Sequence, residues 1–195
     1  EAFEIMQAHA GLLPSPELGV ELKLAEVERQ RGDTKAALKR LNSHITRFGK
    51  NPTFLQHLSA CLGEMNRNDE ALQIAGLLCA EPKPSTPHVA RYIDLLWQEG
   101  AVDRLCEFLE RVTRLQMMHP SILQSVREKA HASEEIAAFI SEFENNVRAT
   151  MIGAKPVDML GIAERLYALE LFAEAKAASE KYMVFFDKSP AVFFV

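Results

Sequence analysis

Prolines that follow a potential helix-capping residue recur along this chain at a nearly constant spacing. The dipeptides are Ser15-Pro16, Asn51-Pro52, Thr86-Pro87, His119-Pro120, Lys155-Pro156 and Ser189-Pro190. Successive prolines lie 36, 35, 33, 36 and 34 residues apart. Proline suits the first turn of a helix because its missing N–H would have no intrahelical partner there. Ser, Asn and Thr can accept a bond from a free N–H of that turn, whereas His119 and Lys155 are expected to be poor caps.

Each interval between two prolines is interrupted near its middle, which predicts two helices per interval. The breaks are Gly32-Asp33-Thr34, Asn66 to Asp69, Gly100 and His131-Ala132-Ser133, while the fifth, near Glu170-Leu171-Phe172, has no turn residue. Apolar residues at three- and four-residue steps support the helices. The predicted pairs are 16–31 with 34–48, 52–65 with 69–80, 87–99 with 102–116, 120–131 with 133–148, and 156–169 with 172–186. A helix over 2–12 precedes them, and a sixth pair begins at 190.

Helices with one apolar stripe must bury it against neighbours, and short connections make those neighbours sequential and antiparallel. Repetition of one period makes the neighbours equivalent, which predicts an all-α stack. We expect one helical-repeat domain over 1–195, with about five pairs and a place at 149–155 where the stack could kink. The chain opens in helical pattern without Met and ends on AVFFV, so we expect it to be an excerpt of a longer protein.

Three segments resemble the tetratricopeptide repeat (TPR) family: RGDTKAALKRL (31–41), NRNDEALQIA (66–75) and, less closely, QEGAVDRLCEFL (98–109). The family has a small residue early in its second helix, where Ala37, Ala71 and Ala175 stand here and Leu105 departs from the pattern. Its turn glycine is matched by Gly32 and Gly100, and its aromatic and Leu-Gly signature is largely missing. The resemblance implies a right-handed superhelical α-solenoid of antiparallel helix pairs.

The resemblance also implies a concave groove, lined by the first helix of each pair, that binds a partner protein or peptide. The candidate binding residues are Leu22, Glu26, Arg29, Gln56, Asp94, Trp97, Glu128, Glu164 and Tyr167. They include four acids and no lysine at the matched positions, so a partner with basic and apolar side chains is expected. The cationic clamp with which the co-chaperone branch binds a carboxylate is not visible. Trp97 and Tyr167 could equally be packing residues between pairs.

Composition and motifs exclude several other functions. The net charge is −5 and no basic run occurs, so no nucleic-acid partner is expected. No apolar stretch is long enough for membrane insertion. The six histidines lack metal-binding spacing and are expected at the surface or in caps, and acid pairs such as Glu134-Glu135 on solvated faces. No nucleophile–base motif occurs, so neither an enzyme, a metal nor a cofactor is expected. Three cysteines without a CxxC are expected to be buried, which favours a cytoplasmic location and leaves a periplasmic one open.

The most apolar part of the sequence is the tail over 182–195, with Phe185, Phe186, Phe193 and Phe194. Its register favours helix because Pro190 keeps the repeat spacing, although aromatic and β-branched runs around 187–190 would also suit a hairpin. An apolar tail needs a covering surface, and a second copy of the chain would supply one. A homo-oligomer formed through this tail is therefore one expectation.

The sequence thus predicts a non-catalytic scaffold for protein–protein interaction. Two alternatives stay open: a repeat module that positions or regulates an enzyme or transcription regulator in the same parent chain, and an accessory arm for secretion or polysaccharide export in a bacterial envelope.

Overall fold

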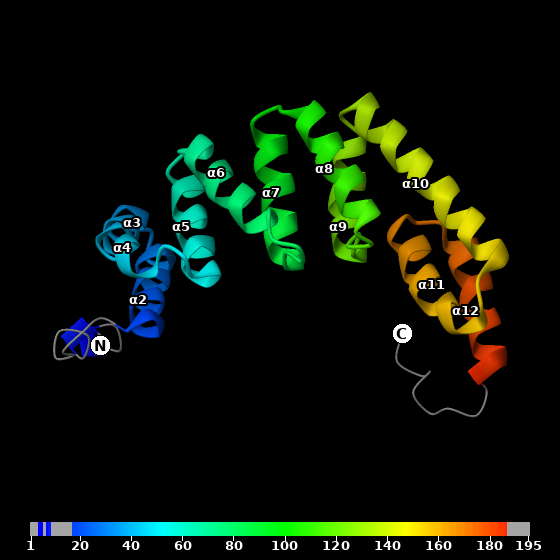
Figure 1. The fold of residues 1–195 in the computed structure, drawn as a ribbon, viewed down its shortest axis with the longest axis horizontal. Coiled ribbons are helices and arrows are strands. Elements are labelled where there is room, and N and C mark those ends of the chain that lie inside the picture. The colour runs from blue at the N-terminus through cyan, green and yellow to red at the C-terminus, as the bar shows by residue number, and fades with distance from the viewer. Residues whose placement is uncertain (1–3, 6, 9–16, 187–195) are drawn as a thin grey trace. The chain divides into compact units, whose positions relative to one another are not determined.

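The computed structural model describes residues 4–5, 7–8 and 17–186, and every regular element in that part of the chain is a helix (Figure 1). Residues 4–5 and 7–8 are helical, and the remainder of the helix predicted over 2–12 lies outside the described residues. Two compact units divide the chain, Glu1–Gly100 and Ala101–Val195. None of the helices described is both long and apolar enough to cross a bilayer.

The first unit contains two complete helix pairs and one further helix. Its helices are α2 (Leu18–Gln30), α3 (Thr34–Ser43), α4 (Ile45–Phe48), α5 (Pro52–Glu64), α6 (Asn68–Cys79) and α7 (Thr86–Gln98). Helix α2 packs against α3 and α5 against α6, as predicted, and α5 also packs on α2 and α3. Helix α7 packs on α6. The predicted helix over 34–48 is divided at His44, which ends α3 and caps α4 with a non-helical backbone.

The second unit repeats this arrangement. Its elements are α8 (Val102–Arg114), α9 (Pro120–Ala130), α10 (Glu134–Gly153), the short 3₁₀ helix η1 (Pro156–Asp158), α11 (Met159–Ala168) and α12 (Phe172–Phe186). Helix α9 pairs with α10 and α11 with α12, while α11 also packs on α9 and α10. Four of the five predicted pairs are thereby confirmed. The third, 87–99 with 102–116, spans the boundary between the units and stays a prediction, as does a single domain over the whole chain.

The small-residue positions of the repeat are buried where two helices approach closely. Ala37 and Ala71 are fully buried, and Ala175 is also in the core. Leu105, the larger residue at the matching position of α8, is fully buried as well. Because an alanine lets two helix backbones approach, these positions confirm the predicted register of the repeat.

Left-handed backbone conformations mark the junctions between helices. Gly32 and Gly100 have φ of +82° and +66°, as expected for a turn glycine. Asn66 and Glu170 take the same conformation, with φ of +56° and +59°. Asn66 lies 34 residues after Gly32, and Glu170 lies two periods after Gly100, so the fifth break has the turn geometry of the others although its residue type does not announce it.

Gln116, between α8 and α9, has a φ of +56°, a conformation that costs a residue with a side chain about 1 kcal/mol. We expect Gln116→Gly to raise the free energy of unfolding by about 0.5–1 kcal/mol, measured by urea denaturation. Glu99→Gly is the matched control, because Glu99 ends α7 with a right-handed φ of −80°. That change should lower stability. Equal effects of the two substitutions would contradict the expectation.

Two expected helix ends were wrong. His119 caps α9 after all, because its ring Nδ1 accepts a hydrogen bond from the Ser121 backbone N–H at 3.3 Å. Thr86 is the first residue of α7 rather than its cap, a role taken by the backbone of Ser85. Asn51 caps α5 as expected, with its side-chain oxygen 3.1 Å from the Phe54 nitrogen.

The linker expected at 149–155 is largely helical. Helix α10 continues to Gly153, five residues beyond its predicted end. The segment Ala149 to Ile152 contains no helix breaker, and the Thr150 hydroxyl donates to the Asn146 carbonyl at 2.8 Å, so the helix propagates through it. Only Ala154 and Lys155 separate α10 from η1. The expected kink is therefore replaced by an extended helix and a short connection.

Candidate functional site

The predicted groove residues of α2 join a charged network that crosses to α5. Glu26 Oε2 lies 2.7 Å from Arg29 Nη1, and Arg29 Nε lies 3.1 Å from Glu64 Oε1. The Thr34 hydroxyl donates to Glu64 Oε2 at 3.0 Å. These contacts tie the first helices of two successive pairs to each other. Glu26 and Arg29 were predicted from the sequence, whereas Glu64 was not, because it lies one residue outside the register that the resemblance implies.

The ionisation of this network follows from its contacts. The hydrogen bond from Arg29 lowers the pKa of the Glu64 carboxyl and raises the pKa of the Arg29 guanidinium. Burial lowers the pKa of the neighbouring His57 imidazole and raises the pKa of the Cys61 thiol to about 11. At neutral pH the face therefore has paired opposite charges, a neutral thiol and a histidine that resists protonation. Its charges stabilise the stacking of α2 and α5.

Arg91 of α7 lies over α5 at Gly63. A Cβ at position 63 would lie 2.0 Å from Arg91 Nη2, so only glycine allows the guanidinium this close. Its Nε is buried and has no hydrogen-bond partner among the described residues. Arg91 also contributes to the low pKa of Glu64. This arginine escaped the sequence analysis because it lies one position away from Ala90, the residue in register with Leu22 and Gln56.

The other predicted residues of the first unit have different surroundings. Leu22 is only 8% exposed and belongs to the core, so its assignment to a partner-binding surface was wrong. The apolar stripe of α2 is wider than the repeat register indicates, and it includes both Leu22 and Leu24. Gln56 is exposed, while Asp94 and Trp97 are half-buried on α7. Half burial leaves both roles of Trp97, packing and binding, as predictions.

In the second unit, Glu164 and Tyr167 line a groove of about 760 Å³ between α11, α12 and the start of α9. We call this the α11 groove; its other lining residues include His119, Leu160, Phe172, Ala175 and Lys176. Tyr167 is 67% exposed and Phe172 is 55% exposed, and their rings meet edge to face with centroids 5.4 Å apart. Glu128 is exposed on α9 and is not among the lining residues.

The α11 groove combines exposed apolar surface with one available acid. Glu164 is exposed and makes no hydrogen bond or ion pair within the described residues. Lys176 forms a 3.8 Å ion pair with Glu180 on α12, so its charge is partly compensated. Exposed aromatic side chains beside a free carboxylate suit a partner that offers apolar and basic groups. The expected partner chemistry is thus represented in one place.

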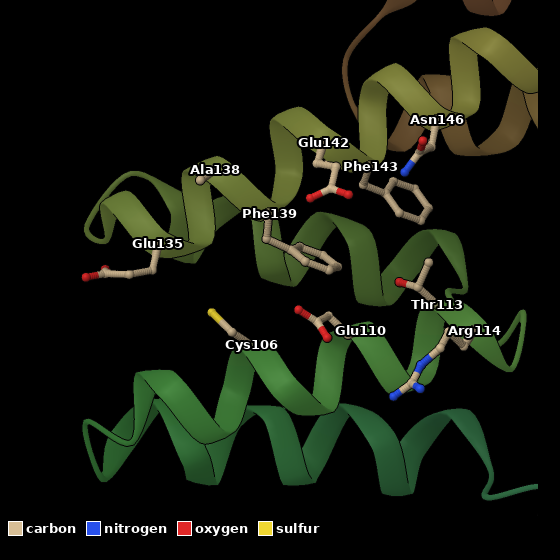
Figure 2. A pocket seen from close by; sticks show the side chains of 10 residues that line it. All are labelled: Cys106, Glu110, Thr113, Arg114, Glu135, Ala138, Phe139, Glu142, Phe143 and Asn146. Atoms are coloured by element: carbon tan, nitrogen blue, oxygen red, sulfur yellow. The ribbon is translucent and has the colours of Figure 1, made fainter.

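A second hollow, of about 390 Å³, lies between α8 and α10 (Figure 2). Glu110 and Arg114 of α8 face Glu135, Phe139 and Glu142 of α10 across it. The sequence analysis placed Glu135 and Glu142 on a solvated helix face, and all three glutamates are indeed exposed. It did not predict the hollow, because its two walls come from different helix pairs.

Cysteines and histidines confirm the expectations only in part. Cys61 and Cys79 are buried, as expected, and Cys106 is half-buried in the wall of the α8–α10 hollow. His88 is buried against α6, where the Cys79 thiol donates to its carbonyl at 3.4 Å, so its expected surface or cap role was wrong. Within the described residues, no three His, Cys, Asp or Glu side chains are grouped as metal ligands. His9 lies outside those residues.

Comparison with known proteins identifies the architecture. No protein-family profile matches the sequence, and no curated protein sequence matches it. Two solved structures resemble it, each at 20% identity. One contains the nearly identical, kinesin-light-chain-type TPR-like repeats of Podosopora anserina, with a TM-score of 0.50 over 89% of this chain and 96% of that one. The other is a tetratricopeptide repeat protein of Parabacteroides merdae, with a TM-score of 0.52 over 97% of this chain and 73% of that one. The chain therefore has a TPR-like helical-repeat fold.

Proposed function

We propose that this chain is a non-catalytic scaffold that binds another protein through the first helices of its repeats, with the α11 groove as the main contact. The observation that carries the proposal is the exposed Tyr167–Phe172 pair lining a 760 Å³ hollow. Exposing two aromatic rings to water is unfavourable, and a partner that covers them gains about 25 cal/mol for each Å² of apolar surface buried. Aromatic residues of this kind carry much of the energy of protein interfaces.

The chemistry of the groove indicates what the partner offers. Glu164 lies one helical turn from Tyr167 on the same stripe of α11, and both line the groove. A partner that inserts an apolar side chain against the rings would bring a lysine or arginine beside it within reach of the carboxylate. The alanines of the lining, Ala163 and Ala175, leave room for the inserted group. The proposed ligand is therefore a protein segment with adjacent apolar and basic residues.

A peptide selection tests this function. A random peptide library displayed on phage is selected on the intact chain, and the affinity of each recovered peptide is measured by fluorescence anisotropy. We expect recovered sequences to combine aromatic or aliphatic residues with lysine or arginine. Tyr167→Ala should weaken their binding about 30-fold or more, because removing an interface anchor costs about 2 kcal/mol or more. Glu164→Lys should weaken it about tenfold.

Matched variants separate a local effect from a general one. Leu115→Ala removes an exposed apolar side chain elsewhere in the unit, and Glu107→Lys makes the same charge change on α8. Neither residue lines the α11 groove. Peptides that bind wild type and Tyr167→Ala equally well would show that this groove is not the binding site.

A further inference from the structure

The α8–α10 hollow is the first of three adjoining cavities along one side of α10. Their volumes are about 390, 150 and 480 Å³. The first and second share Thr113, Phe143 and Asn146, and the second and third share Thr150, Ile162 and Arg165. We call the three together the α10 groove. It lies wholly within the second unit and shares no lining residue with the α11 groove.

The length of the α10 groove comes from the unexpected extension of α10. The lining residues of this helix run from Glu135 to Gly153, a rise of about 27 Å at about 1.5 Å per residue. Thr150 and Gly153, in the extension, line the third cavity. An extended peptide of about eight residues would span this distance.

The charges of the α10 groove are separated along its length. Glu110, Glu135 and Glu142 line the first cavity, toward the start of α10. Glu110 and Glu142 have no ion pair or hydrogen bond among the described residues, whereas Glu135 accepts one from the Ser133 hydroxyl at 2.7 Å. Glu135 thus keeps its negative charge, and the other two carboxylates are available to a ligand.

The cations lie further along. Arg114 lines the far end of the first cavity, and Arg165 lines the second and third. Neither forms an ion pair in the part of the chain that the structure describes. Asp158 lines the third cavity as well and weakens the positive potential at its end. The groove is therefore acidic in its first half and has two arginines in its second half.

An apolar floor connects the two halves. Phe139 and Phe143 of α10 are stacked, with centroids 6.3 Å apart and ring planes 24° apart. Figure 2 shows both rings directed toward α8, between the carboxylates and Asn146. The groove thus has carboxylates, an aromatic surface and guanidinium groups in that order.

We propose that the α10 groove is a second docking surface, for a protein segment that has basic residues at one end, apolar residues in the middle and acidic residues at the other. The charge order selects this partner, because a segment with the opposite order meets like charges at both ends. Arginine forms two parallel hydrogen bonds with a carboxylate, which would fix the acidic end at Arg165. The basic end would lie beside Glu110 and Glu142, and the apolar centre on Phe139.

Synthetic peptides test the charge order directly. The probe is a fluorescein-labelled peptide of about eight residues with lysines at one end, phenylalanine and leucine in the middle and glutamates at the other end. A second version runs in the opposite chain direction, since the groove does not set the polarity of the bound backbone. The control peptide has the same composition with its charges interspersed. We expect one of the two segregated peptides to bind the intact chain at least about tenfold tighter than the control peptide.

Charge variants locate the binding. Glu110→Lys with Glu142→Lys should weaken the segregated peptide about tenfold or more, and Arg165→Glu should do the same. A peptide whose glutamates are replaced by lysines should regain affinity for Arg165→Glu. The matched control is Glu128→Lys with Glu164→Lys, an equal charge change outside this groove.

Each outcome decides the proposal. Loss of binding in the α10 variants, with no loss in the control double variant, supports it. Loss in the control double variant alone would place the peptide on the α11 side, supporting the proposed function and overturning the second surface. Equal binding of segregated and interspersed peptides, or no measurable binding of either segregated peptide, would also overturn it. Circular dichroism and the urea midpoint verify that the variants are folded; the substituted glutamates are exposed.

Discussion

Arg40→Ala is expected to lower the free energy of unfolding by about 3 kcal/mol, because it leaves two buried carboxylates without their counterion. Arg40 of α3 lies 2.7 Å from Glu28 and 3.1 Å from Glu21, both on α2. Glu28 and Glu21 are 8% and 6% exposed, so water cannot replace the lost cation. His44 lies 3.4 Å from Glu21 and compensates part of the charge, which places the expected loss at the lower end of the range for buried pairs.

Urea denaturation monitored by circular dichroism measures this effect. The matched control is Arg67→Ala, which breaks an exposed arginine–glutamate pair with Glu70 on α6. That pair should contribute less than about 1 kcal/mol, since both groups are solvated and the side chains lose entropy when they pair. Replacing Arg40, Glu21 and Glu28 together by leucine should restore most of the stability. Equal losses for Arg40→Ala and Arg67→Ala would show that the α2–α3 triad is effectively in water.

Phe54→Ala is expected to lower the free energy of unfolding by about 4 kcal/mol, since it removes a ring from the centre of the first unit. Phe54 is the largest fully buried side chain among the described residues. It lies on α5, which packs on α2, α3 and α6. Its ring also meets Phe48 at a centroid distance of 6.1 Å, an aromatic contact that alanine cannot replace. The cavity remains partly unfilled because helices from several pairs surround it.

Hydrogen exchange shows where this stability is lost. Amide protection in Phe54→Ala should fall in α5 and in the helices that pack on it, as expected for a stack in which each repeat contacts only its neighbours. Phe54→Leu is the control, because it keeps most of the apolar volume and should cost about 1 kcal/mol. Phe172→Ala, at an exposed position, should change stability by less than about 1 kcal/mol. A loss in Phe172→Ala as large as that in Phe54→Ala would contradict the assignment of the core.

Local sequence information sufficed for most helices and their order. Asn51-Pro52 begins α5, Gly32 ends the turn after α2, and the apolar stripes of α5 and α8 enter the core as predicted. These features act within one or two helical turns, where caps and a period of 3.6 residues decide the conformation. The misjudged end of α10 came from giving too much weight to Gly153, since one glycine at a helix terminus is tolerated.

The candidate site was less predictable, because its chemistry depends on contacts between helices. The repeat register led to Glu26, Arg29, Glu164 and Tyr167, which do lie in a charged network and in a groove. It also led to Leu22, which is in the core, and it missed Glu64 and Arg91. A register states which side of a helix a residue occupies. It does not state how far a neighbouring side chain reaches across to it.

The sequence by itself determined that this chain forms paired helices of one repeating length, because periodicity, caps and small residues act locally and recur about every 34 residues. Only the tertiary structure decided which charges are paired and where hollows remain. Arg29 and Glu64 are 35 residues apart, and the α10 groove is assembled from α8, α10 and α11. Distances of a few ångströms between helices determine both features, and the order of residues along the chain does not specify them.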